Sequence, residues 1–124
     1  MPNLTWLEFI ETSIFTKRFG ALGLHDSLLK LQSDLVEDPT RWPVIAGLRG
    51  ARKGRVGDKQ GGKGKSGSHR YIYLYLSHLN RVYLLFVFEK NEQDNLSEEQ
   101  RRVIARLCDV LRKECEKWPP KLRN

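Results

Sequence analysis

Basic side chains that could handle a phosphodiester lie close together in one part of the sequence. Of the 22 lysines and arginines and 15 acids in the chain, eight bases and one acid, Asp58, fall between Arg49 and Arg70, which leaves 14 of each elsewhere. The whole excess of +7 therefore sits in one short window. Each phosphate that a lysine or arginine neutralises releases counterions and adds affinity. Charge this concentrated favours a polyanion site over an ordinary solvated face.

Four of these cations are placed to act on RNA without a metal. Lys53 and Arg55 stand two apart in a predicted strand and therefore share a face. Arg70 opens the next strand, and Lys90 directly follows a later one, so we expect three strand ends to meet at one cationic cleft. Metal-free cleavage needs a base for the 2′-OH, a cation for the phosphorane charge and an acid for the leaving 5′-oxygen. Closely packed cations can lower the pKa of a lysine enough to make it the base. A purely RNA-holding role for the four stays open at this point.

Other kinds of chemistry lack the residues that they need. The tract Gly64-Lys65-Ser66 suggests a phosphate loop, but that motif requires glycine at the position of Lys59, and the other register has glycine where Ser or Thr belongs. The three histidines share no spacing with one another or with carboxylates, which argues against a two-metal nuclease. No serine or cysteine has the surroundings of a triad nucleophile. We expect no metal and no cofactor, and we expect Cys108 and Cys115 to be buried thiols.

The segments before the basic window have helical periodicity. Apolar residues recur at helical spacing over Thr12–Leu22 and again over Leu24–Leu35. Gly20 and Gly23 interrupt the pattern, which predicts a helical hairpin. A short first strand is predicted over Leu4–Ile10.

The window itself and the segment after it change to strand patterning. A short strand is predicted over Ala51–Val56, followed by the glycine-rich loop Gly57–Ser68. Tyrosines alternate with aliphatic residues over Tyr71–Leu76, which is the period of a strand. The segment Val82–Phe88 is apolar on both faces, so it is predicted to be a central strand, antiparallel to the one before it.

The last predicted element is a helix. Ser97 and Gln100 form a capping box at its start, and Pro119-Pro120 ends it. Its apolar side is predicted to carry Val103, Ile104, Leu107 and Leu111. The expected fold is α+β in two layers: an N-terminal helical hairpin packed on a small antiparallel sheet, with a C-terminal helix.

Length and composition fit one domain over residues 1–124. Hydrophobic residues make up 40% of the chain and charged residues 30%, an ordinary globular composition. No stretch approaches the ~20 apolar residues of a membrane span. The N-terminus lacks a basic segment followed by an apolar one, as a secretory signal would have. We expect a cytoplasmic protein.

Four tracts together resemble the RelE/ParE toxin superfamily, and most of all its HigB-type branch. They are GLRGARKGRV (Gly47–Val56), GSHRYIYLYL (Gly67–Leu76), VYLLFVFEKNE (Val82–Glu92) and LSEEQ (Leu96–Gln100). The resemblance covers nearly the whole chain. It implies a RelE-like microbial RNase fold and the toxin of a type II toxin–antitoxin system. Such a toxin is a ribosome-dependent, metal-independent mRNA endoribonuclease, or mRNA interferase. It would inhibit translation from the ribosomal A site and be silenced by a cognate antitoxin.

The resemblance also implies residue roles. Lys53 and Arg55 fall on the basic pair that follows Leu-Arg-Gly, Arg70 on the phosphate-binding arginine, and Lys90 on the lysine after the last strand. RelE has a second basic residue where this chain has Asn91, and a tyrosine where this chain offers only Ser97 nearby. The implied roles are Lys53 as base, Arg55 and Arg70 as transition-state clamps, and Lys90 or His69 as acid. The remaining expected RNA-binding residues are Arg49, Arg52, Lys59, Lys63, Lys65, His69 and Asn91.

Strand parity and competing functions limit this hypothesis. Arg70 shares a face with the aliphatic residues of its strand and His69 with the tyrosines, so only one of the two should face the cleft unless the strand bulges at its start; we favour Arg70. The tyrosines could stack on bases, but packing is the favoured interpretation. A gyrase-directed toxin of the same superfamily would not need the four cations, and a non-catalytic RNA-binding module would need only the charged window.

Overall fold

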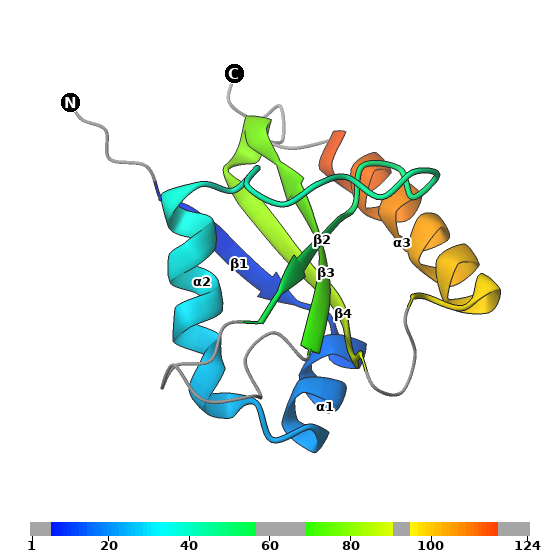
Figure 1. The fold of residues 1–124 in the computed structure, drawn as a ribbon. Helices are drawn as coiled ribbons and strands as arrows, with labels where there is room; N and C mark the ends of the chain where they lie inside the picture. Colours follow the sequence, from blue (N-terminus) through cyan, green and yellow to red (C-terminus); the bar gives the residue numbers. More distant parts are fainter. Residues whose placement is uncertain (1–5, 57–68, 91–94, 117–124) are drawn as a thin grey trace.

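The computed structural model describes residues 6–56, 69–90 and 95–116 (Figure 1). A four-stranded sheet and three α-helices make up this part of the chain. The strands are β1 (Glu8–Glu11), β2 (Arg52–Arg55), β3 (His69–Leu76) and β4 (Arg81–Glu89), and the helices are α1 (Ser13–Ala21), α2 (Leu28–Glu37) and α3 (Glu98–Glu116). Each predicted element is present, with the first strand beginning later than expected. None of the described helices is long and apolar enough to cross a membrane.

The sheet is mixed, so the prediction of an antiparallel sheet was wrong. Its strand order is β1-β4-β3-β2. Strand β3 pairs antiparallel with both β2 and β4, as predicted, and β4 is an inner strand. Strand β1 instead pairs parallel with β4, with Ile10 opposite Tyr83. Parallel pairing requires a long connection, and here two helices and two strands separate the partners along the chain.

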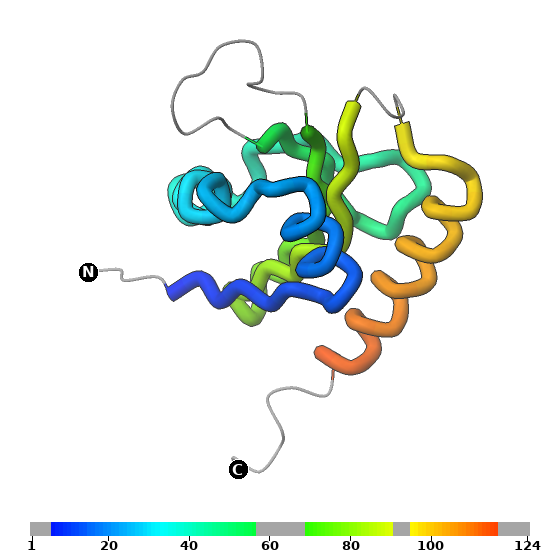
Figure 2. Tube along the Cα trace, turned by 90° about the horizontal axis from the view of Figure 1, so that it is seen from below, coloured from blue at the N-terminus to red at the C-terminus, as the bar shows by residue number. Residues whose placement is uncertain are grey.

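Helices cover both faces of the sheet, so the prediction of two layers was also wrong. Helix α3 packs on one face, against the aliphatic residues of β3 such as Ile72 and Leu74. Helices α1 and α2 pack on the other face, where Tyr71 and Tyr73 are fully buried. Figures 1 and 2 show α3 on one side of the strands and α1 and α2 on the other. A strand that is apolar on both faces needs a layer on each. The finer arrangement of α1 and α2 as a hairpin stays a prediction.

Helix ends follow the signals in the sequence. The hydroxyl of Thr12 accepts a hydrogen bond from the Phe15 amide at 3.1 Å and caps α1. At α3, Ser97 and Gln100 exchange side chain-to-backbone hydrogen bonds of 2.9 and 3.1 Å, which confirms the predicted capping box. Cys108 and Cys115 are buried free thiols, also as predicted. On the predicted apolar side of α3, Ile104 is buried, whereas Val103 is 49% exposed. Pro119-Pro120 lies outside the described residues.

A bulge interrupts the pairing of β3 with β4. Ile72 pairs with Phe86 but Tyr73 pairs with Leu84, which leaves Leu85 as an extra residue on β4. A bulge of this kind breaks strict alternation. As a result the consecutive residues Leu85 and Phe86 both lie on the α3 face.

Candidate functional site

Three strand ends meet at one end of the sheet, where the basic residues of the sequence are concentrated. Strand β2 ends at Arg55, which lies opposite Arg70 near the start of β3. Arg70 in turn lies opposite Phe88 of β4, and Lys90 directly follows that strand. Figure 2 shows these three strand ends side by side. The structure therefore places Arg55, Arg70 and the backbone of Lys90 in one neighbourhood.

The guanidinium groups of Arg55 and Arg70 form the electrostatic centre of this neighbourhood. Residues paired across two strands project from the same face, so the register directs both side chains to one side. Arg70 is half-buried, and its pKa is lowered, first by burial and second by the positive charge of Arg55. Arg70 also donates a hydrogen bond to the His69 carbonyl oxygen at 3.4 Å. Two neighbouring cations, one of them partly desolvated, are a suitable environment for a phosphate.

Lys53 lies on the same face but contacts a different element. It pairs with Ile72 in the strand register. Its ammonium group donates a hydrogen bond to the side-chain oxygen of Asn95 at 3.1 Å, two residues before the N-cap of α3. The partly buried Lys53 side chain is thus directed toward the segment that leads into α3. Asn95 had no signal in the sequence that marked it as a site residue.

Trp42 packs beside β2 and contacts Arg55. Its indole lies against Gly54, where an added Cβ would be 2.6 Å from Cδ1 and 2.7 Å from Nε1. The guanidinium carbon of Arg55 is 5.7 Å from the centre of the indole, and that of Arg41 is 5.5 Å from it. Our sequence analysis missed Trp42. The available signal was a glycine inside a strand, which marks close approach by another group.

Two residues of the predicted RNA-binding set have protein partners. Arg49 forms an ion pair of 3.3 Å with Asp109 on α3. Arg52 donates hydrogen bonds to the carbonyl oxygens of Trp42 and Thr40 at 2.6 and 3.3 Å. Both residues precede the end of β2 where Arg55 lies, and both tie neighbouring segments together.

The other predicted residues divide by position. His69 pairs with Glu89 and, because β3 keeps its alternation there, lies on the tyrosine face, opposite to Arg70. Lys90 is exposed. Tyr71 and Tyr73 have no exposed surface, which confirms the packing interpretation over base stacking. Lys59, Lys63, Lys65 and Asn91 lie outside the described residues.

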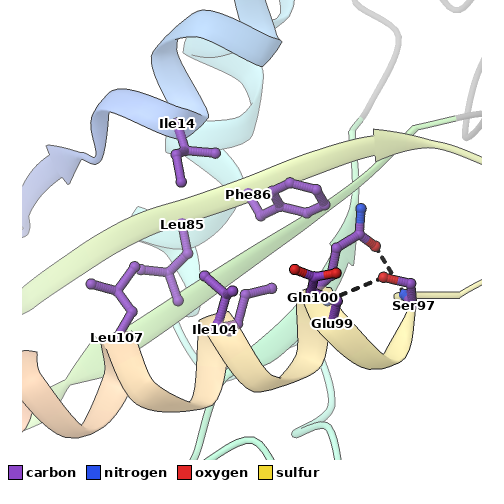
Figure 3. Close-up of a pocket in the computed structure, with 9 residues that line it drawn as sticks. Ile14, Leu85, Phe86, Ser97, Glu99, Gln100, Ile104 and Leu107 are labelled. Atoms are coloured by element: carbon purple, nitrogen blue, oxygen red, sulfur yellow. Dashed lines mark hydrogen bonds between the residues drawn. The ribbon is translucent and has the colours of Figure 1, made fainter.

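A pocket opens on the α3 face, beside Phe86. It has a volume of about 360 Å³ and lies between α1 and α3 (Figure 3). The bulge supplies two of its walls, because Leu85 and Phe86 both line it. Arg18 covers the Phe86 ring at 4.5 Å. The remaining lining residues are the apolar Ile14, Val103, Ile104 and Leu107 and the polar Ser97, Glu99 and Gln100.

Metal-ligating side chains do not cluster in the described ranges. No group of three or more histidines, cysteines or carboxylates there could hold a metal ion. The cations of the candidate site are Lys53 on the α3 side, Arg55 and Arg70 in register, and Lys90 at the end of β4.

Comparison with known proteins bears on the fold. No protein-family model matches the sequence. The structure is similar to the crystal structure of the isolated E. coli RelE toxin in its P21 form, with a TM-score of 0.53 and 16% sequence identity. The similarity covers 82% of this chain and 99% of that chain. The mixed sheet with helices on both faces is therefore a RelE-like fold.

Proposed function

We propose that this chain is a toxin of a type II toxin–antitoxin system that cleaves mRNA on the ribosome without a metal. The observation that carries the proposal is the pair formed by Arg55 and the half-buried Arg70, which lie in register at the strand ends of a RelE-like fold. The +7 window of the sequence adds affinity for a polyanion. We further propose that residues 1–124 form one such domain of the HigB-type branch, that it acts in the cytoplasm, and that an antitoxin protein silences it.

The chemistry needs three roles, which four residues can fill. The amine of Lys53 accepts the proton of the 2′-OH, and the 2′-oxygen attacks the adjacent phosphorus. Arg55 and Arg70 stabilise the charge that develops on the phosphorane oxygens. The P–O5′ bond then breaks, and Lys90 donates a proton to the leaving 5′-oxygen. The products are a 2′,3′-cyclic phosphate and a 5′-hydroxyl end. The register favours Lys90 over His69 as acid, because His69 lies on the opposite face.

The ends of the cleaved RNA test this chemistry. We expect cleavage of mRNA on programmed ribosomes to leave 2′,3′-cyclic phosphate and 5′-hydroxyl ends. Ribosomes need magnesium themselves, so their buffer keeps it, and toxin treated with chelator beforehand and then freed of it should cleave as fast as untreated toxin. A requirement for a divalent ion, with 5′-phosphate products, would refute the proposed mechanism.

Expression in cells tests the toxin assignment. Expressed alone, the chain should arrest growth, and the product of a neighbouring antitoxin gene should relieve the arrest. The readout is ribosome-associated mRNA cleavage compared with DNA supercoiling in the arrested cells. Arrest with intact mRNA and lost supercoiling would assign the chain to gyrase. Binding of RNA with neither arrest nor cleavage would leave a non-catalytic RNA-binding module.

A further inference from the structure

We propose that Trp42 is a positioning residue of the phosphate site, whose indole holds the guanidinium of Arg55 beside Arg70. The site's role in RNA cleavage rests on the function proposed above, whereas the positioning itself rests on contacts of Trp42. The guanidinium carbon of Arg55 lies 5.7 Å from the centre of the indole. This is within the ~6 Å at which a guanidinium is attracted by an aromatic face.

Arg55 needs such a partner because of its place in the sheet. It is the last residue of an edge strand, its side chain is exposed, and its neighbour in register is another arginine. Like charges opposite each other repel, and a long exposed side chain has many rotamers to lose on ordering. Without an attractive contact, the guanidinium would move into solvent, away from Arg70. The indole supplies that contact from the tyrosine face of the sheet, where it lies against Gly54.

Three residues of β2 hold the indole and the backbone around it. Gly54 lies against it so closely that no Cβ fits between them. The carbonyl oxygen of Trp42 accepts a hydrogen bond of 2.6 Å from Arg52, and that of Pro43 accepts one of 3.1 Å from the Lys53 amide. Gly54 and Arg52, which precede Arg55 in β2, thus hold the tryptophan that contacts Arg55. Strand β2 and the segment around Trp42 form one positioning unit.

Arg41 provides an internal control for this inference. Its guanidinium carbon is 5.5 Å from the same indole, which is the same type of contact. Its charge, however, pairs with Asp34 at 3.6 Å and Glu37 at 3.8 Å on α2. Arg41 therefore has its own charge partners on α2, and no strand pairing brings it to Arg70. Loss of Arg41 should lower folding stability, because its ion pairs on α2 are lost, and the charge of the phosphate site should stay the same.

The first experiment measures the position of Arg55 without RNA. In the wild-type chain, ring current from the indole should shift the NMR signal of the Arg55 Nε–H group. Trp42→Leu should remove this shift, and Trp42→Phe should keep part of it. In titrations with inorganic phosphate, Trp42→Leu should weaken binding by about two- to fivefold, the size expected for an exposed cation–π contact. Arg41→Gln should bind phosphate as the wild type does.

A double-mutant cycle separates positioning from a merely structural role. Combined with Arg55→Gln, Trp42→Leu should cause no further loss of phosphate affinity, because the residue through which it acts is gone. In single-turnover cleavage on programmed ribosomes, Trp42→Leu should lower the rate and leave the half-saturating ribosome concentration unchanged. An equal loss in both backgrounds, or an unshifted Arg55 signal in the wild type, would overturn the inference. If the wild-type chain shows the shifted Arg55 NMR signal and binds phosphate but cleaves no RNA, the proposed function fails and the positioning role stands.

Discussion

Replacing Gly54 with alanine should destabilise the protein through a single side-chain clash. The added Cβ would lie 2.6 Å from Cδ1, 2.7 Å from Nε1 and 2.9 Å from Cγ of Trp42. Carbon atoms in ordinary contact are about 3.5–4.0 Å apart, so the indole must retreat by about 1 Å. The hydrogen bonds around Trp42 resist that movement. Overpacking of this kind costs about 1–3 kcal/mol of unfolding free energy.

The same substitution at Gly20 should have the opposite sign. Gly20 lies inside α1, and a Cβ there would meet His25 at 3.6 Å, an ordinary contact. Glycine in a helix costs about 0.5–1 kcal/mol relative to alanine, so Gly20→Ala should stabilise by up to that amount. The two variants make the same chemical change and differ only in what the new methyl group meets.

The difference in unfolding free energy between the two variants is measured by urea unfolding, monitored by fluorescence and circular dichroism. Trp42→Leu provides the internal test, because shortening this side chain removes the atoms that the new Cβ would meet. In that background Gly54→Ala should lose most of its cost, which is a coupling larger than the ~0.5 kcal/mol within which independent sites are additive. If Gly54→Ala is as stable as the wild type, or keeps its full cost beside Leu at position 42, then the indole does not pack on Gly54 as described.

Three further outcomes are expected. Arg70→Ala should lower the cleavage rate by about 10²–10³-fold. The control is Arg81→Ala, at the far end of β4 and paired with Glu8 at 2.8 Å, which should lower stability and leave the rate unchanged. Equal rates for Arg70→Ala and wild type would refute the site. Neutralising Lys59, Lys63 or Lys65 singly should reduce the salt slope of RNA binding by about one unit, with turnover kept. Burial raises the pKa of Tyr73 to about 12, so between pH 10 and 12 this tyrosine loses its proton only in the unfolded chain and lowers stability by about 1.4 kcal/mol per pH unit. Burial also raises the pKa of Tyr71, so Tyr73→Phe should reduce the slope of the urea midpoint–pH curve there without abolishing it.

Local signals predicted most of the elements but could not fix how they layer. The capping box of Ser97 and Gln100 and the apolar run of β4 determine their elements directly, and both predictions are confirmed. In β3 the tyrosines and the aliphatic residues are both apolar enough to be buried, so alternation alone left the second face ambiguous. The hydroxyl of Tyr73 resolves this inside the protein by donating a hydrogen bond to the Pro39 carbonyl oxygen at 2.8 Å. That contact joins residues 34 positions apart, which no local pattern can reveal.

For a similar reason, the sequence could not predict the bulge in β4 or the contact of Trp42 with Arg55. Every residue from Val82 to Phe88 is buried, so a shift by one residue leaves the hydrophobic pattern of β4 unchanged. Register is specified only where one face is polar. The place of the bulge, and with it the pocket beside Phe86, is therefore set by packing. Trp42 likewise meets Arg55 through a segment whose position depends on Arg52 and on the backbone of Lys53.

Charge counting in the basic window overstates the positive charge that faces a ligand. Arg49 forms an ion pair with Asp109, and the Arg52 guanidinium donates hydrogen bonds to two backbone carbonyl groups. Both side chains hold the framework around β2, while Arg55 and Arg70 meet at its end. An arginine can serve either purpose because its planar group binds carbonyl, carboxylate and phosphate oxygens alike. Composition singles out this window, but only the strand register separates the arginines that hold the framework around β2 from those that lie opposite each other at the strand ends.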